Sequence, residues 1–585
     1  MSTATRVRAL LRAVRNAPVA ASVGWRHLER DRWHTLLLAL RTLPPATRRR
    51  IADSLGHRSP SPLAGLALAA DGRREDAARI LDKAARNAGS RRLSALIAVS
   101  AALDAPREAA LLLERLPGDD PRRPLLDALV AARAGDLTHA KQAAERAGWR
   151  AARLRRRLAA ELTALTTQTG WAGRAASPLL AVHADRVLHL VTNALPDVTA
   201  GYTVRTQGIA AAQRRIGLDA QVASRLGFPV TVGHITAARL VHVGQVPYHR
   251  ILPVSWLPAA EDSALWCDVE ETARLVERLR PAVLHAHSKY GNAQVALALR
   301  DRFGLPVVYE VRGFLEETWR SRGRDPDTDA YRLARAAETR CMSAADVVVT
   351  LSECMKAEIV ERGVEADHVV IVPNAVDDTF LAAPPDASQL RLRLGIQPNE
   401  VVVGTVTTVN DYEGLDALVD AVAMLRDRGA QARLLVVGSG PALSALRQRA
   451  ADLGLGDSAV FTGVVPFSEV RGYHAAIDVF AVPRADTPVT RLVTPLKPLE
   501  AMATGRPVVA SDMAPLREIV SPGHTGVVAR AGDPESLAAA IELLLSDRAA
   551  RLRMGETARR WVAEHRTWDT AARAYRDLYD RLRHK

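Results

Sequence analysis

The sequence predicts two α/β domains whose doubly wound parallel sheets face each other across a cleft, preceded by an all-α helical-repeat domain. Short runs rich in valine, isoleucine and leucine alternate with helical segments from about residue 177 onward. Such continuously apolar strands are typical of parallel sheets covered on both faces. A proline-rich segment at 381–390 divides the runs into two sets. We therefore predict domains at residues 1–175, 176–380 and 381–585.

The first predicted helix is basic and amphipathic. Apolar residues recur at the spacing of one helical face, with arginines around them: Val7, Leu10, Leu11 and Val14 among Arg6, Arg8, Arg12 and Arg15. Such a helix can lie on an anionic membrane surface. An apolar stripe can equally pack on the next helix of a core, and the sequence leaves both interpretations open.

From about residue 60 to 165 a pattern recurs every 30–34 residues. Small residues precede a short turn and a second amphipathic helix in residues 69–84, 101–116 and 131–147. This period is typical of stacked helical hairpins. The copies loosely resemble tetratricopeptide repeats, although they lack several large residues of that repeat.

The positive charge of the chain is concentrated in its first third. Residues 1–175 carry 32 Lys+Arg and 16 Asp+Glu, whereas the remaining residues carry 47 and 49. The asymmetry predicts an anionic membrane surface or a protein partner for residues 1–175. Alternatively, arginine serves there only as a soluble helix former. Nucleic acid is not expected, because aromatic residues, which stack on bases, make up only 4% of the chain.

The composition predicts a cytoplasmic protein. Three cysteines, Cys267, Cys341 and Cys354, are too few and too dispersed for a disulfide framework or a spaced metal site. No apolar run approaches the roughly 20 residues that cross a bilayer, and arginines interrupt the N-terminal segment where a signal peptide would be apolar. Attachment to the inner face of the membrane would be peripheral.

Two sets of strand-like runs predict the two sheets. The first set is 186–193, 219–224, 281–287, 305–311, 345–352 and 368–374. The second set is 400–408, 432–440, 459–465, 476–483, 506–511 and 525–529. Ligands of doubly wound folds lie at the carboxyl ends of the strands. The cleft between the two domains is therefore the predicted active site.

A short predicted helix, with residues suited to ligand binding, follows the fourth run of the second set. Thr494 suits the N-cap and Pro495 the first helical position, so the helix is expected to begin there. Free N–H groups and Lys497 would bind a pyrophosphate, with Arg484 adding positive charge. Glu500 can accept hydrogen bonds from sugar hydroxyls. Alternatively, Lys497 and Glu500 form a surface pair three residues apart.

Six segments, in the same order, resemble retaining glycosyltransferases of family 4: 195–207, 284–292, 307–314, 369–377, 412–418 and 493–503. The resemblance extends from about residue 185 to 580 and is greatest to a subset associated with exopolysaccharide and exosortase systems. It implies the GT-B fold and sugar transfer from a UDP- or GDP-linked donor to a glycan or lipid-linked acceptor. It also implies retention and a place in cell-surface polysaccharide or glycoconjugate biosynthesis.

The resemblance assigns roles in donor binding to individual residues. Glu500 matches the glutamate that binds the ribose hydroxyls of the donor. Gly438, Ser439 and Gly440 match a loop near the nucleotide, where absent side chains let the backbone approach. Gly201 matches the glycine that faces the donor's phosphate and sugar, and the local pattern agrees, because a strand and a loop precede it and a helix follows.

The chain also departs from the family pattern. Most members have a second glutamate eight positions before the first, where this chain has Leu492, and the close subset has a carboxylate where this chain has Arg491. Asp486 is the nearest upstream carboxylate and the candidate substitute. Arg312 stands where many members have a histidine, and it is a candidate catalytic residue, as are His287 and Asp486. His287 is a candidate acceptor contact or proton carrier, with strand-end packing as the alternative.

A further departure concerns phosphate neutralisation. Family members commonly carry a basic pair in the loop before Gly414, whereas this chain has Thr408 or Val409 and Glu413 there. Lys497 and Arg484 must then supply more of the positive charge.

The resemblance implies a front-face mechanism in which cations stabilise the departing diphosphate. We expect no cofactor and no metal, since no Asp-x-Asp motif stands at a strand end. Two alternatives remain: a sugar-nucleotide epimerase of the same fold, and a degenerate, non-catalytic binding module, which Leu492 and Arg491 keep open.

Overall fold

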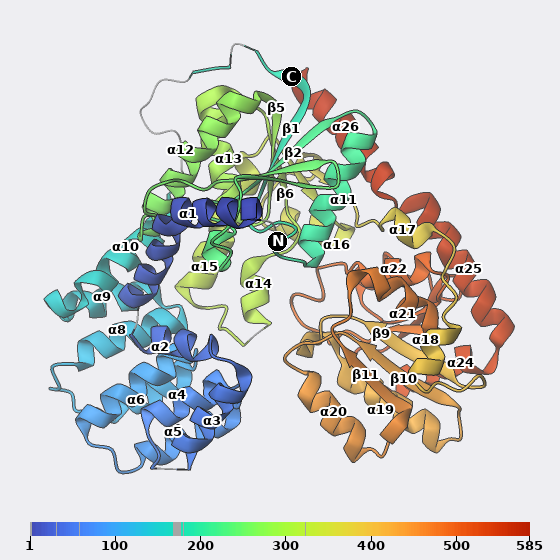
Figure 1. Cartoon of the computed structure of the whole chain (residues 1–585), viewed down its shortest axis with the longest axis horizontal. Coiled ribbons are helices and arrows are strands. Elements are labelled where there is room, and N and C mark those ends of the chain that lie inside the picture. The colour runs from blue at the N-terminus through green and yellow to red at the C-terminus, as the bar shows by residue number, and fades with distance from the viewer. Residues whose placement is uncertain are drawn as a thin grey trace.

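The structure, a computed structural model, describes residues 3–30, 32–57, 59–167, 177–179, 181–321 and 323–584. An all-helical region is followed by two α/β domains with parallel sheets (Figure 1). The predicted fold class is therefore confirmed. The boundary predicted between residues 175 and 176 lies outside the described residues.

The helical region is built largely from helical hairpins. Short turns join α4 to α5, α6 to α7 and α8 to α9, in the three segments where the sequence predicted a turn followed by an amphipathic helix. Its elements are α1 (Thr3–Arg30), α2 (Arg32–Arg41), α3 (Pro45–Gly56), α4 (Pro62–Ala70), α5 (Arg74–Ala85), α6 (Ser90–Ala102), α7 (Pro106–Glu114), α8 (Arg123–Ala134), α9 (Leu137–Arg146), η1 (Gly148–Ala151) and α10 (Ala152–Thr166). Buried alanines and leucines fill the contacts between the hairpins.

Helix α1 packs on the neighbouring α/β domain through the face opposite to its apolar stripe. Asn16 Nδ2 donates to the carbonyl oxygens of Ile235 (2.8 Å) and Ala237 (3.0 Å). The stripe itself is exposed, with Leu10 and Leu11 65% and 64% accessible. The interpretation that this stripe packs on the next helix of a core is therefore wrong.

The N-terminal α/β domain is built on a sheet with the order β3-β4-β2-β1-β5-β6-β7-β8. Its strands are β1 (His183–Val191), β2 (Asp219–Ser224), β3 (Leu240–Val243), β4 (Val246–Arg250), β5 (Pro281–His287), β6 (Val307–Glu310), β7 (Val347–Thr350) and β8 (Val369–Ile371). The register places His189 beside His285, and His287 beside Glu310. Each predicted run contains a strand, but the sequence did not predict β3 and β4; β3 runs antiparallel to β4 at the sheet edge.

Helices and short 3-10 turns cover this sheet on both faces. They are α11 (Gly201–Arg215), η2 (Val230–Val232), α12 (Glu261–Leu279), α13 (Tyr290–Phe303), α14 (Leu315–Arg320), α15 (Asp329–Ala344), α16 (Glu353–Glu361) and η3 (Ala366–His368). Helix α11 begins at Gly201, as predicted, and Gly217 just beyond its end has a φ of +92°.

The C-terminal α/β domain has the parallel order β11-β10-β9-β12-β13-β14. Its strands are β9 (Val401–Val406), β10 (Ala432–Val437), β11 (Ala459–Gly463), β12 (Val479–Val482), β13 (Val508–Ser511) and β14 (Gly526–Ala529). The helices and turns are α17 (Asp378–Leu381), α18 (Ser388–Arg393), η4 (Asp411–Glu413), α19 (Leu415–Asp427), α20 (Leu443–Asp452), η5 (Gly456–Ser458), η6 (Phe467–Glu469), α21 (Val470–Ala476), α22 (Lys497–Ala503), α23 (Ala514–Arg517), α24 (Pro534–Ser546) and α25 (Arg548–His565).

The last helix, α26 (Trp568–Arg583), crosses back to the N-terminal α/β domain and packs along α11 (Figure 1). Trp568, Tyr575 and Tyr579 share a buried cluster with apolar residues of β1, β5 and β6. A β-carbon at Gly208 would lie 2.4 Å from the Trp568 ring, so only glycine lets the indole seat against α11. Residues at the end of the predicted 381–585 domain thus pack with the other domain.

Within the described residues, none of the helices combines the length and the apolar character that a membrane span requires.

Candidate active site

The two α/β domains meet at residues 487–496, the segment between β12 and α22. Asn374 Nδ2, in the N-terminal domain, donates to the carbonyl oxygen of Thr494 (2.9 Å). A β-carbon on Gly201, the first residue of α11, would lie 3.7 Å from Leu496 Cδ1. The structure therefore places Gly201 beside the start of α22, across the junction of the two domains.

Helix α22 begins at Lys497 and not at Pro495, which corrects the expected start. Thr494 makes no helix cap, because Leu496 occupies the N-cap position. Pro498 lies in the first turn, where the missing N–H removes no helical hydrogen bond. With seven residues the helix is short, so the predicted anion site depends on side chains and not on the helix terminus.

Lys497 and Arg484 both face one carboxylate, Glu413. Lys497 Nζ lies 3.1 Å from Glu413 Oε1 and also donates to Thr407 Oγ1, while Arg484 Nε lies 3.5 Å from Glu413 Oε2. Burial opposes ionisation of Glu413, but the charges of Arg484 and Lys497 outweigh it and lower its pKa. The cations Lys497 and Arg484 thus lie beside the carboxyl ends of β9 and β12, where they can bind an anionic ligand, and the carboxylates of Glu413 and Glu500 both act on the charge of Lys497.

Glu500 faces His474 and not Lys497. His474 Nε2 lies 3.7 Å from Glu500 Oε2, and the buried imidazole stacks on Phe480 with ring centroids 5.2 Å apart. Neither nitrogen of this ring has a hydrogen-bond partner among the described residues. Lys497 instead pairs with Glu413 at 3.1 Å, and the charge of Glu500 also acts on it, so a Lys497–Glu500 pair stays an alternative.

The glycine loop after β10 packs against the loop after β9. A β-carbon at Gly438 would lie 1.8 Å from the carbonyl oxygen of Thr407, and one at Gly440 would lie 2.1 Å from that of Val409. The Val409 N–H donates to the carbonyl oxygen of Ser439 (3.1 Å). The absent side chains let these two loops approach each other at the strand ends, and they bring the predicted nucleotide loop next to Thr407.

A pocket of about 140 Å³ opens between the domains beside Arg484. Its lining comes from both domains: Thr318, Ser321, Tyr412, Arg484, Val489, Thr490 and Val493. This volume is below the roughly 300–1,000 Å³ typical of small-molecule sites. A nucleotide sugar would therefore need the domains to separate. Among the cavities of the described residues, a larger one, about 870 Å³, lies instead between the helical region and the N-terminal domain.

Asp486 is ion-paired at the surface. Arg491 Nε and Nη2 donate to its two carboxylate oxygens at 2.5 and 2.8 Å. Hydrogen bonding from Arg491 lowers the pKa of Asp486. Leu492 packs against the core of the N-terminal domain. The catalytic role of Asp486 stays a prediction, and its carboxylate is already engaged by Arg491.

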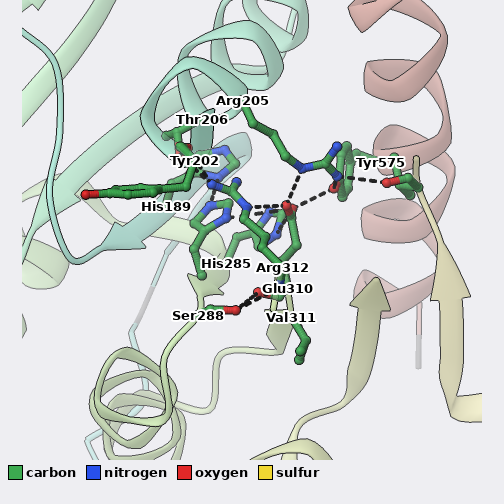
Figure 2. A network of polar contacts seen from close by, with 12 residues as sticks. His189, Tyr202, Arg205, Thr206, His285, Ser288, Glu310, Val311, Arg312 and Tyr575 are labelled. Atoms are coloured by element: carbon green, nitrogen blue, oxygen red, sulfur yellow. Dashed lines mark hydrogen bonds and ion pairs between the residues drawn. The ribbon is translucent and has the colours of Figure 1, made fainter. Parts of the chain in front are cut away.

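A buried polar network surrounds Glu310, the last residue of β6 (Figure 2). Glu310 Oε1 accepts from Arg205 Nε (2.8 Å) and Arg312 Nε (2.5 Å), and Oε2 accepts from the Tyr575 hydroxyl (2.6 Å). Burial opposes ionisation of Glu310, but the charges of Arg312 and Arg205 outweigh it and hold its pKa well below the ordinary value. Arg205 comes from α11 and Tyr575 from α26, so this carboxylate joins three elements.

Arg312 connects this network to the first turn of α11. Its Nη1 donates to the carbonyl oxygen of Tyr202 and to Thr206 Oγ1, both at 2.8 Å (Figure 2). Gly201 opens the same turn. The structure thus makes Arg312 a buried residue that positions this turn; contact with a substrate stays a prediction.

His287 is buried among two further histidines. His287 Nε2 lies 2.9 Å from His189 Nδ1, His189 Nε2 lies 2.8 Å from Gln213 Oε1, and His285 Nδ1 lies 2.7 Å from the Tyr579 hydroxyl. Burial lowers the pKa of all three histidines, to about 3 for His189. Buried histidines with a lowered pKa are neutral at pH 7 and accept a proton only weakly.

The three histidines form the one group of His, Cys, Asp or Glu residues, within the described chain, whose ligand atoms lie close enough together for a metal ion. Four of their six ring nitrogens bond to one another, to Gln213 and to Tyr579. The other two, His285 Nε2 and His287 Nδ1, make no hydrogen bond among the described residues and lie 3.1 and 3.7 Å from Glu310 Oε2. Arg205 and Arg312 add positive charge nearby, which opposes a cation. This donor set fits a hydrogen-bonded network better than a metal site, and metal independence of the reaction stays a prediction.

Sequence reasoning missed several residues of these clusters. Glu413 was visible as an acid at an expected basic position, but its pairing with Lys497 was not predicted. Both Glu310 and Arg205 were visible in the sequence as charged residues. Glu310 stands within an apolar strand, and Arg205 stands on a helix of the same domain. The approach of Tyr575 from the end of the chain had no signal in the sequence.

Two family models match the α/β domains. Residues 200–375 match a model described as a glycosyl transferase 4-like domain, and residues 386–561 match one described as glycosyl transferases group 1. A GDP-mannose-dependent alpha-(1-6)-phosphatidylinositol monomannoside mannosyltransferase of Mycobacterium tuberculosis is 34% identical over 251 residues, which are 42% of this chain. The match spans 64% of that relative's length.

Solved structures share the fold. Sucrose-phosphate synthase from Thermosynechococcus elongatus has a TM-score of 0.56 at 21% identity, and the Anabaena protein HepE in complex with UDP has 0.54 at 19%. Each match covers 68% of this chain and 99% of the other. Both likenesses support the two-domain GT-B architecture.

Proposed function

Because residues 200–375 and 386–561 carry the two domains of a GT-B glycosyltransferase, we propose that this protein transfers a sugar from a nucleotide-sugar donor to a glycan or lipid-linked acceptor. The observation that carries the proposal is the charge cluster of Lys497, Arg484 and Glu413 at the strand ends, with Glu500 three residues beyond Lys497 and Gly201 on the facing domain.

The donor is a UDP- or GDP-linked sugar. A relative named for GDP-mannose supports GDP, and a fold neighbour with bound UDP supports UDP. In this site Lys497 and Arg484 would bind the diphosphate, and Glu500 would accept hydrogen bonds from the ribose hydroxyls. Gly438, Ser439 and Gly440 lie beside them and would border the nucleotide.

Transfer proceeds with retention and without a metal or cofactor. Lys497 and Arg484 stabilise the negative charge that develops on the departing diphosphate, in a site where Glu413 fixes their positions. Leu492 supplies no carboxylate where a nucleophile could stand. The acceptor therefore attacks from the face that the diphosphate leaves, through an oxocarbenium-like sugar.

The acceptor places the reaction in cell-surface polysaccharide or glycoconjugate biosynthesis. The relative's name specifies a phosphatidylinositol mannoside, a lipid-linked glycan. Residues 1–175 then bring the enzyme to the membrane or to a protein that carries the acceptor.

The test is calorimetric titration of UDP, GDP and their common sugar conjugates into the full chain without divalent metal. Glu500→Ala removes the proposed ribose contact, and Glu556→Ala, on the exposed side of α25, serves as the matched control. We expect one nucleotide to bind wild type and control, and binding to be lost in Glu500→Ala. Equal binding to both variants would refute the donor site. Binding of no nucleotide would support the non-catalytic module instead.

A further inference from the structure

The outward face of α1 is an apolar stripe along most of the helix. The side chains of Val7, Leu10, Leu11 and Val14 are each at least half exposed, and that of Trp25 is 49% exposed. Val7 and Trp25 are separated by about five turns at 3.6 residues per turn, so both side chains lie on the same face. Exposed apolar side chains gathered on one face mark an interaction surface more often than scattered ones do.

The inward face of α1 is fixed to loops of the N-terminal α/β domain. Val19 is buried with Val230 and Leu257, and Asn16 binds the loop that follows β2. These loops lie at the carboxyl ends of β2 and β4, which run parallel. They also expose apolar side chains of their own, Val232 and Ile235 in the first and Val254 and Trp256 in the second. The rigid attachment presents the stripe to the outside.

Trp25 also lines the large cavity between the helical region and the N-terminal domain. This groove, of about 870 Å³, is bounded by α1, α2, α6, α8, α10 and residues 257–260. Eight of its twenty lining residues are arginines, and the rest are apolar or uncharged, so that no carboxylate of the described residues lines it. Arg91, Arg153 and Arg156 form no ion pair with any residue that the structure describes. A cleft lined by charges of one sign concentrates counterions of the other.

We propose that the outward face of α1 and the arginine groove together form a membrane-contact surface, in which α1 lies among the lipid headgroups and the groove binds the phosphate of an anionic lipid. The two parts are continuous through Trp25, and their chemistry is complementary to the two parts of a phospholipid. An amphipathic helix with arginines beside its apolar face binds such surfaces through burial and charge together. The surface lies over loops at the carboxyl ends of β2 and β4, the end of the sheet at which doubly wound folds bind their ligands.

Flotation of the full chain with vesicles tests this surface without measuring sugar transfer. Vesicles of phosphatidylcholine alone are compared with vesicles that also contain phosphatidylglycerol. The stripe variant is Leu10→Glu with Leu11→Glu, and its control is Leu392→Glu, an equally exposed leucine on α18. The groove variant is Arg91→Gln, Arg153→Gln and Arg156→Gln, and its control changes three exposed arginines of α25 and α26: Arg553→Gln, Arg560→Gln and Arg581→Gln.

We expect wild type and controls to bind anionic vesicles and to release them as salt rises. The stripe variant should bind at least about tenfold more weakly, because charged side chains replace apolar ones that enter the interface. The affinity of the groove variant should fall about a hundredfold, because each of the three arginines near an anionic surface contributes roughly fivefold. Circular dichroism and unchanged nucleotide titration establish that both variants are folded.

Two results would overturn the proposal. If either variant binds vesicles as tightly as its control does, the residues changed in it are not part of a membrane contact. Equal binding of wild type to neutral and anionic vesicles removes the phosphate site. If the groove variant binds vesicles normally but no longer binds an acidic peptide that wild type binds, the groove binds a protein segment and not a lipid. Failure of the nucleotide titration alone would refute the proposed transferase and leave this surface intact.

Discussion

Lys497 Nζ lies 3.1 Å from Glu413 Oε1, so the main cation of the proposed donor site is held by a buried acid. Arg484 approaches the same carboxylate at 3.5 Å. A buried charge without its partner is costly, whereas a pair replaced by uncharged groups of similar shape often costs little. The arrangement therefore links the stability of the domain to the residues proposed to bind the diphosphate.

Changing Lys497 and Glu413 singly and together separates these two effects. Lys497→Met should lower the free energy of unfolding by about 2 kcal/mol, because Glu413 stays buried with only the more distant Arg484. The double variant with Glu413→Gln should recover most of that loss. Urea denaturation measures both, and additive losses in the double variant would contradict the pairing. Nucleotide binding should be weak in both variants, since Lys497 is absent from each.

His474 positions Glu500 in the proposed donor site. His474→Phe keeps the stack on Phe480 and removes ring nitrogens that have no hydrogen-bond partner among the described residues. Stability should therefore hold or rise. Nucleotide affinity should fall about fivefold, the equivalent of about 1 kcal/mol, because Glu500 loses the imidazole that lies 3.7 Å away and pairs with its carboxylate when protonated. Calorimetric titration beside the exposed-site control His524→Phe checks this, and unchanged affinity would remove His474 from the site.

The sheets could be predicted from sequence because buried parallel strands are continuously apolar. Runs such as 401–406 and 432–437 carry this signal in full. Strands β3 and β4 lack it, because His242, Pro247 and His249 interrupt their apolar residues. β3 is a partly exposed edge strand and needs no apolar run, whereas β4 is buried between β3 and β2 and escaped prediction only because of its polar residues and proline.

The candidate site was predictable only in part. Lys497 and Glu500 stand in a local motif next to a strand end, and the structure places both near the domain junction. Their actual partners, Glu413 on η4 and His474 on α21, come from other elements, and no local spacing encodes such contacts. The same holds for Glu310 and Tyr575, which are 265 residues apart.

The Glu310 network should contribute strongly to the stability of the N-terminal α/β domain. Glu310→Gln leaves the buried guanidinium groups of Arg205 and Arg312 without an anion, and we expect a loss of about 3 kcal/mol or more. Tyr575→Phe removes one neutral donor to the same carboxylate and should cost only about 1–2 kcal/mol. Urea denaturation of the two variants gives the comparison. A loss for Glu310→Gln no larger than that for Tyr575→Phe would mean that the network is not held by its charge.

Glu338 on α15 should make stability depend on pH. Its carboxylate is buried and accepts from the Tyr290 N–H (3.0 Å) and the Tyr309 hydroxyl. Burial, only partly offset by the Tyr309 hydrogen bond, raises its pKa from the ordinary 4.5 to about 7. As pH rises, the unfolded chain therefore releases this proton before the folded protein does. The contribution of Glu338 to the free energy of unfolding is present below pH 4.5 and is lost as pH rises to about 7.

Glu338→Gln isolates this contribution, because glutamine keeps an acceptor and a donor for the two tyrosines but does not ionise. From the lower to the upper end of that pH range, the free energy of unfolding of the variant should rise by about 3 kcal/mol relative to that of wild type. Urea denaturation at a series of pH values measures the difference, and other titrating groups cancel in it. A difference that stays constant with pH would mean that Glu338 ionises as readily in the folded protein as in the unfolded chain.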